Sequence, residues 1–92
     1  MFKFNRVRKS QYINATIYDL RTQNNVQVIR NVPADQIVSK LKRKSDRGLI
    51  QAALRYADKL LAEGQAINFL YYDRQNFGVE LSCVDWRPEA VK

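Results

Sequence analysis

Apolar side chains recur every three or four residues between Leu49 and Leu61, and every second residue on both sides of that segment. A spacing of three to four places side chains along one side of an α-helix, whereas a spacing of two places them on one face of a β-strand. Ser45 or Asp46 is a suitable N-cap for the helix, and Gly64 is a suitable C-cap. The chain is therefore predicted to contain a long amphipathic helix between two regions of strand.

The region before this helix is predicted to form a β-hairpin. In residues 12–20, aliphatic side chains at positions 13, 15 and 17 alternate with polar or tyrosine side chains. Residues 21–25 are rich in turn-forming types, and residues 26–32 resume the alternation. Pro33 ends the second strand because it has no N–H group to donate to a sheet.

A second hairpin is predicted after the helix, with strands over 67–72 and 79–86 and a turn over 73–78. The two hairpins are similar in sequence near their tips, since YDLRTQNNVQV occupies 18–28 and YYDRQNFGVEL occupies 71–81. Two interpretations are open. These residue types suit hairpin ends in any protein, or the chain has an internal pseudo-symmetry in which both loops face the same partner.

Between the first hairpin and the long helix, Ile37, Val38 and Leu41 form a short stripe with helical spacing. This stripe predicts a further helix over about 35–44. The expected order of elements is therefore ββ-αα-ββ.

Ninety-two residues suit one domain. We expect a single α+β domain over 1–92, in which an antiparallel sheet of two hairpins is covered on one face by a helix pair. Residues 1–10 are expected to form a basic N-terminal arm, and residues 87–92 a polar tail.

The alternation also predicts which residues the helices cover. One face of the sheet is expected to pack against the helices through a set of mostly aliphatic side chains: Ile13, Ala15, Ile17, Ile67, Phe69, Val79 and Leu81. The opposite face is expected to be rich in large side chains, many of them aromatic: Tyr12, Tyr18, Leu70, Tyr72, Val84 and Trp86.

Three interpretations of that second face are open: ordinary cross-strand packing, self-association, and stacking on nucleic-acid bases. Base stacking also requires cations beside the rings, and the candidates are Arg30, Arg74 and Arg87.

The composition argues against catalysis. The chain has no histidine, which is the commonest general base near neutral pH, and its three glycines form no phosphate-binding loop. Cys83 is expected to be buried and inert, because it shares a strand face with Val79 and Leu81. A non-enzymatic protein without a metal or cofactor is therefore expected.

A cytoplasmic location is expected from the cysteine content and the hydropathy. One cysteine cannot form an internal disulfide, so nothing indicates an oxidising compartment. No apolar run approaches the roughly 18 residues of a membrane span, and the N-terminus lacks the apolar block of a signal peptide. No membrane association is expected.

The net charge of +7 is unevenly distributed along the chain. Two tracts hold nine of the sixteen basic residues: Lys3, Arg6, Arg8 and Lys9 in the arm, and Lys40, Lys42, Arg43, Lys44 and Arg47 between the predicted helices. Cations near a helix C-terminus also stabilise the helix, so part of the second tract has a structural explanation.

Clustered cations favour polyanionic partners, because phosphate contacts release condensed counterions. The expected function is nucleic-acid binding, to DNA or RNA, by a small protein that is expected to form a homodimer. The nine residues of the two basic tracts are expected to contact phosphates. The alternative is a protein-interaction module, such as an inhibitor or adaptor of phage or mobile-element type, that docks an acidic partner through the aromatic sheet face.

Overall fold

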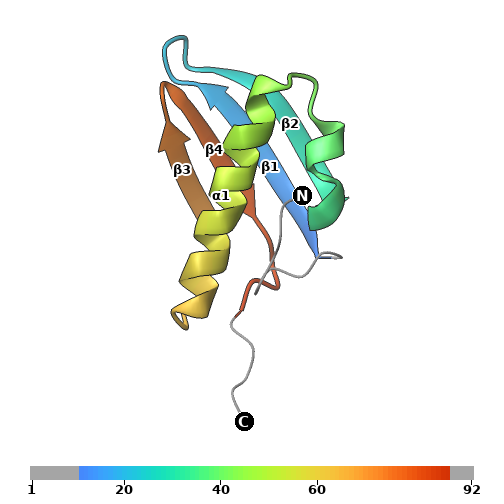
Figure 1. The fold of residues 1–92 in the computed structure, drawn as a ribbon, viewed down its shortest axis with the longest axis vertical. Coiled ribbons are helices and arrows are strands. Elements are labelled where there is room, and N and C mark those ends of the chain that lie inside the picture. The colour runs from blue at the N-terminus through green and yellow to red at the C-terminus, as the bar shows by residue number, and fades with distance from the viewer. Residues whose placement is uncertain (1–10, 88–92) are drawn as a thin grey trace.

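The computed structural model describes residues 11–87, which form a four-stranded antiparallel sheet with one α-helix across one face (Figure 1). The elements follow the order ββ-α-ββ: β1 (Tyr12–Asp19), β2 (Asn24–Pro33), α1 (Ser45–Ala62), β3 (Phe69–Arg74) and β4 (Phe77–Ser82). The strand order is β2-β1-β4-β3, so the two hairpins lie side by side and β1 pairs with β4 in the centre. The predicted basic arm and most of the predicted tail lie outside the described residues.

The central pair of strands forms the base of the core. Ile13, Ala15 and Ile17 of β1 are buried, as the alternation predicted. Val79 and Leu81 of β4 are fully buried on the same face, because Ile17 pairs with Val79 and Ala15 pairs with Leu81. Side chains directly opposite each other in an antiparallel pair share a face, so this register builds one apolar surface across both hairpins.

The helix α1 covers that surface, and the prediction of a long amphipathic helix is confirmed. Its buried apolar residues are Leu49, Ile50, Ala53, Leu54, Ala57 and Leu61. Gly64 ends the helix with a φ of 85°, and the N–H of Gln65 donates to the carbonyl of Leu60. This left-handed C-cap satisfies carbonyl groups that the helix itself leaves without a donor.

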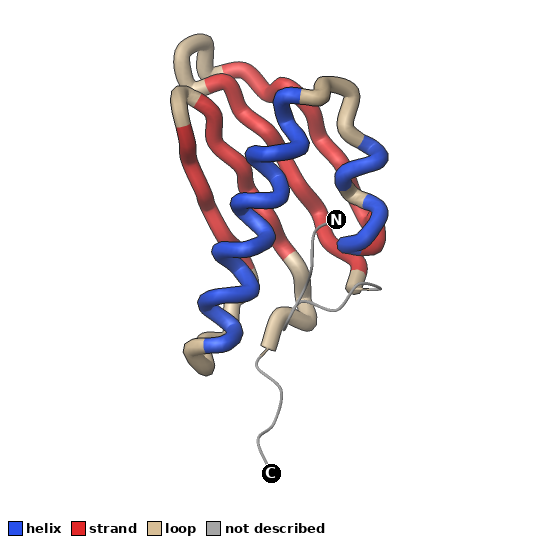
Figure 2. Tube along the Cα trace, in the orientation of Figure 1, coloured by secondary structure: helices blue, strands red, loops and turns tan. Residues whose placement is uncertain are grey.

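The predicted helix over 35–44 is wrong, so α1 has no helical partner. The segment forms two short 3₁₀ turns, η1 (Ala34–Gln36) and η2 (Val38–Lys40), which lie on the same face of the sheet as α1 (Figure 2). Ile37 and Leu41 are buried, so the apolar stripe is real. However, the chain is already extended at Leu41, with a ψ of 133°.

The side chain of Gln27 in β2 explains why no α-helix continues there. Its amide Nε2 donates to the carbonyl of Lys40 at 2.8 Å, and its Oε1 accepts from the N–H of Lys42 at 3.0 Å. These backbone groups therefore bond across to β2 instead of continuing a helix. A short segment gains too few hydrogen bonds to offset the unfavourable first turn of a helix.

The side chains of β3 were predicted on the wrong faces of the sheet. Leu70 is buried and Tyr72 packs against the core, whereas Phe69 is 56% exposed. The register places Leu70 opposite Leu81 and Tyr72 opposite Val79, both of which lie under α1. The alternation changes phase ahead of β3, since Ile67 is also buried. A shift of one residue moves every following side chain to the other face.

The predicted position of Trp86 is also wrong. The strand β4 ends at Ser82, four residues earlier than predicted, and a turn over 84–85 follows. This turn returns Trp86 to the core, where it is fully buried, while Val84 is left 83% exposed. The backbone carbonyl of Trp86 accepts the N–H of Ile67 at 3.1 Å, which ties the segment after β4 to the segment before β3. Cys83 is buried, as predicted.

Within residues 11–87, no helix is both long enough and apolar enough to cross a membrane.

The facing of β3 can be tested by truncating two neighbouring residues. Leu70→Ala is expected to lower the free energy of unfolding by about 2–5 kcal/mol, because it opens a cavity under α1. Phe69→Ala, on the exposed side, is expected to lower it by less than about 1 kcal/mol. Urea denaturation of both variants measures the difference, and a larger loss for Phe69→Ala would contradict the register.

A candidate nucleic-acid interface

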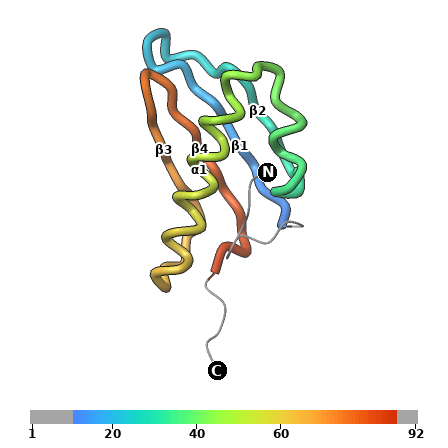
Figure 3. The backbone as a smooth tube through the Cα atoms, viewed as in Figure 1, coloured from blue at the N-terminus to red at the C-terminus, as the bar shows by residue number. Residues whose placement is uncertain are grey.

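The tips of both hairpins and the start of α1 meet at one end of the sheet (Figure 3). The N–H of Leu20 in the first tip donates to the carbonyl of Asn76 in the second tip at 2.8 Å. Gln75 and Asn76 form a two-residue turn with φ values of 50° and 69°. Two left-handed residues match the twist of the flanking strands, so this turn holds the second tip beside the first.

Two guanidinium groups lie over the ring of Phe77 at this end. The Cζ atom of Arg21 is 5.4 Å from the centroid of the ring, and the Cζ atom of Arg43 is 5.3 Å from it. A cation this close to an aromatic ring is attracted to its electron-rich face. Phe77 thus joins the first hairpin tip, which carries Arg21, to the segment before α1, which carries Arg43.

An aspartate holds each of these arginines. Arg21 donates from Nε to Oδ1 and from Nη2 to Oδ2 of Asp19, both at 3.1 Å. Arg43 donates from Nε to Oδ2 of Asp46 at 3.0 Å and from Nη2 to Oδ1 at 2.7 Å. Two parallel bonds fix the plane of a guanidinium group as well as its position.

The charges at this end interact. The hydrogen bonds from Arg21 are the main cause that lowers the pKa of Asp19, and the bonds to Asp19 raise the pKa of Arg21. The positive charge of Arg43 acts in the opposite direction and lowers the pKa of Arg21. The pKa of Arg43 is raised, chiefly by its hydrogen bonds to Asp46. The two arginines therefore belong to one electrostatic cluster.

The structure brings together four of the predicted phosphate-binding residues and adds two more. We define the basic end as six exposed residues from three segments: Arg21, Lys42, Arg43, Lys44, Arg47 and Arg74. Lys40 is also exposed but lies in η2, on the flank beside β2. The other four predicted residues, Lys3, Arg6, Arg8 and Lys9, lie outside the described residues.

Arg21 and Arg74 were not predicted to join this cluster. A shallow hollow of about 210 Å³ connects Arg74 with Ser45 and Asp46 at the start of α1. The sequence contains a signal for both arginines, because each lies one or two residues after an aspartate at the tip of a similar hairpin. Only the pairing of the hairpins places both tips at the start of α1.

Asp46 affects how much of the basic end is available to an anion. Its side chain is 3% exposed, whereas that of Arg43 is 42% exposed. The buried carboxylate therefore offsets most of the charge of Arg43 at short range. Among the described residues, Lys42, Lys44, Arg47 and Arg74 have no such ion pair, so these four provide the excess positive charge.

The face of the sheet opposite α1 is covered by no element of residues 11–87, and we call it the uncovered face. Its exposed large side chains are Tyr12, Val28, Phe69 and Tyr71. Tyr12 and Tyr18 were predicted on this face, and both lie there. Leu70, Tyr72 and Trp86 were predicted there wrongly, and Phe69 and Tyr71 take their place.

Tyr71 leans across the sheet onto Gly78. A Cβ atom at residue 78 would lie 2.5 Å from the Tyr71 hydroxyl oxygen, so any larger residue there would displace the ring. Beside it, the Tyr18 hydroxyl donates to Oε2 of Glu80 at 2.7 Å, and this bond is the main cause that raises the pKa of Tyr18. The centre of the uncovered face is thus formed by two tyrosines around one carboxylate.

Comparison of the chain with protein-family models, curated proteins and solved structures gives no match. Within the described part of the chain, no group of three His, Cys, Asp or Glu residues is arranged to hold a metal ion.

The pairing of Asp19 with Arg21 predicts a pH dependence. A carboxyl group whose pKa is lowered by folding stabilises the folded state above its unfolded pKa, which is about 3.9 for aspartate. This contribution is lost as the pH falls through the folded pKa. Asp19→Asn is therefore expected to be less stable than the parent protein at neutral pH, with the difference shrinking below about pH 4.

Urea denaturation at a series of pH values measures this difference. Asp73→Asn is the matched control, since Asp73 is exposed near the tip of the other hairpin. A destabilisation by Asp19→Asn that stays constant down to about pH 2 would show that the lowered pKa is not its cause.

Proposed function

We propose that this protein binds single-stranded nucleic acid, with phosphates at the basic end and bases against the uncovered face. The supporting observation is the convergence of cations from three chain segments at one end of a sheet whose opposite face carries a row of exposed rings. Proteins that bind single strands combine a positively charged surface, which follows the backbone, with aromatic side chains, on which bases stack.

The cations and the rings lie on opposite faces of the same end of the sheet. Phe77 packs against the core on the α1 side, where Arg21 and Arg43 lie over its ring. The next residue, Gly78, faces the other way and pairs with Tyr18, and Tyr71 leans over it on the uncovered face. A strand whose phosphates contact the basic end would therefore pass around the hairpin tips to bring a base to Tyr71.

Phe69 continues the row along β3. It lies two residues from Tyr71 on the same face, which is a distance of about 7 Å in an extended strand. Glu80 lies opposite Tyr71 in the register. A carboxylate repels phosphate, so we infer that the bases, rather than the backbone, contact the centre of the uncovered face.

The proposal predicts a steep dependence of affinity on salt. Each phosphate contact with a single strand changes the slope of log K against log salt by about 0.7. Replacing Lys42 and Lys44 together with alanine is expected to weaken binding to a thymidine homopolymer of about ten nucleotides and to reduce the slope by about 1.4. Fluorescence anisotropy over a salt series measures both quantities.

A double variant of α1 serves as the control. Arg55→Ala with Lys59→Ala removes the same charge from residues that lie about 15–21 Å along α1 from its start. This control is expected to leave the slope unchanged. Equal effects of the two double variants would show that net charge, and not the basic end, determines binding.

One observation favours a second candidate, which is a protein-interaction module that docks an acidic partner. Val28, Phe69 and Tyr71 expose apolar surface on the uncovered face, and the basic end forms a charged rim beside it. Aromatic residues at the centre with charged residues at the rim are typical of protein interfaces.

Truncating Tyr71 distinguishes the two candidates. Loss of a stacking ring weakens single-strand binding by about 1–3 kcal/mol, so Tyr71→Ala is expected to reduce affinity for the same oligonucleotide by that amount. Tyr56→Ala is the matched control, because Tyr56 is 40% exposed, close to the 43% of Tyr71, but lies on α1. Unchanged affinity in Tyr71→Ala would reject stacking and favour the protein-interaction candidate.

A further inference from the structure

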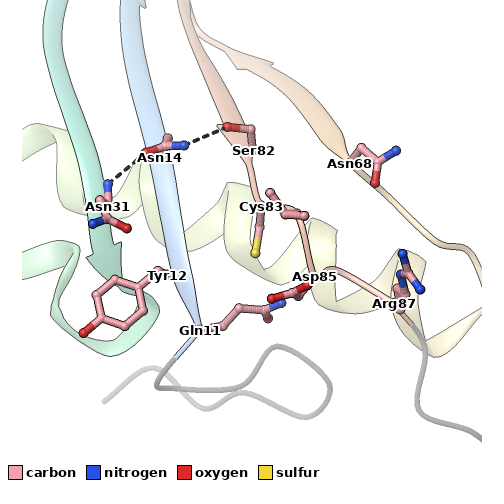
Figure 4. A pocket seen from close by; sticks show the side chains of 10 residues that line it. Gln11, Tyr12, Asn14, Asn31, Asn68, Ser82, Cys83, Asp85 and Arg87 are labelled. Carbon is pink, nitrogen blue, oxygen red and sulfur yellow. Dashed lines mark hydrogen bonds between the residues drawn. The ribbon is translucent and has the colours of Figure 1, made fainter.

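The uncovered face ends in a pocket of about 700 Å³ at the opposite end of the sheet from the hairpin tips. Residues from all four strands or the segments next to them line it (Figure 4). Tyr12 and Asn31 lie on one side, Asn68 and Arg87 lie on the other, and Asn14 and Ser82 lie between them. The lining is therefore rich in amide groups, with one aromatic ring and one guanidinium group.

Hydrogen bonds fix the middle of this pocket. Oδ1 of Asn14 accepts the backbone N–H of Asn31 at 2.8 Å, and Nδ2 of Asn14 donates to Oγ of Ser82 at 3.3 Å. These bonds connect three neighbouring strands, β2, β1 and β4, across the pocket wall. The Asn14 amide and the Ser82 hydroxyl are thus held in place by each other and by the backbone of Asn31, and the exposed side-chain amides of Asn31 and Asn68 lie on either side of them.

Asn31 has an unusual backbone conformation. Its φ is 58°, and the pairing of β2 with β1 shifts register between Ile13 and Ala15, next to Asn31. An irregularity of this kind changes the direction of a side chain and is common beside functional sites. Here it accompanies an exposed amide at the edge of the pocket.

We propose that this pocket receives one unpaired nucleobase of the bound strand. Asparagine amides carry a donor and an acceptor side by side and can pair with the edge of a base. Tyr12 is 58% exposed and offers a ring for stacking. Arg87 provides a cation for the phosphate of that nucleotide, and Asp85, also in the lining, is an acceptor for a base amino group.

This inference rests on the proposed function and adds selectivity to it. The basic end and the stacking rings contact features that all nucleotides share, whereas amides read the edge of a particular base. Tyr12 and Asp19 are the two ends of β1, which spans about 24 Å. One strand of about ten nucleotides can therefore reach both ends of the uncovered face.

The test uses four DNA homopolymers of about ten nucleotides, one for each base. The parent protein is expected to bind them with affinities that differ by about tenfold or more, as one good base contact provides. Asn31→Gly combined with Asn68→Ala removes two amides, and the glycine keeps the left-handed backbone without strain. This variant is expected to bind all four homopolymers with nearly equal affinity.

Tyr12 tests the stacking part of the proposal. Tyr12→Ala is expected to weaken binding by about fivefold to a hundredfold, while Tyr12→Phe, which keeps the ring, is expected to bind like the parent protein. Thermal unfolding of each variant checks that the fold is retained.

The outcomes separate the two proposals. If the parent protein binds none of the homopolymers at low salt, the proposed function itself fails. If it binds them, but the two amides and the Tyr12 ring can be removed without changing affinity or base preference, the pocket proposal is overturned and the basic end is retained. Loss of base preference in the amide variant supports the pocket.

Discussion

The antiparallel pairing of β1 with β4 is the interaction on which the rest of this structure depends. A single two-stranded hairpin is at best marginally stable in water. Pairing the two hairpins through their inner strands doubles the width of the apolar face, and Ile17 meets Val79 at its centre under α1. The same pairing turns both hairpin tips towards one end of the sheet.

This pairing also creates the basic end. Arg21 and Arg43 are far apart in the sequence, yet both contact the ring of Phe77. Their aspartate partners hold the guanidinium groups in position, and the buried Asp46 offsets the charge of Arg43. The lysines and arginines around them then provide an exposed positive surface at the start of α1. The ion pairs fix the position of the two arginines, and the net charge comes from neighbouring residues that have no ion pair within residues 11–87.

The coverage of the sheet determines which of its faces is exposed. One helix and two 3₁₀ turns cover the apolar face within the described residues, and the other face is left with Tyr12, Phe69 and Tyr71 exposed. The charge changes from cations on the α1 side of the hairpin tips, through Glu80 at the centre of the uncovered face, to amides at its far end. An extended polyanion with bases along one side matches this order, since its phosphates and its bases require different surroundings.

Local patterns predicted the elements whose side chains follow an unbroken period. The body of α1 with its end at Gly64, the strands of the first hairpin and the buried Cys83 follow from spacing and a C-capping glycine. The predicted N-cap, Ser45 or Asp46, is wrong, because the N-cap is Lys44, which makes no side-chain capping bond. The predictions failed where the spacing of apolar residues changes, or where a side chain far away in the sequence bonds to the backbone. The alternation changes phase before Phe69, a turn returns Trp86 to the core, and Gln27 bonds the backbone at Lys40 and Lys42.

The same division applies to the candidate site. The cluster of Lys42, Arg43, Lys44 and Arg47 can be predicted from the sequence, because these residues are neighbours along the chain. The position of Arg21 and Arg74 beside them, and the outward facing of Tyr71 rather than Tyr72, depend on how the strands pair. The physical reason is that strand register is set by contacts between residues far apart in the sequence, and a shift of one residue exchanges the two faces of a strand.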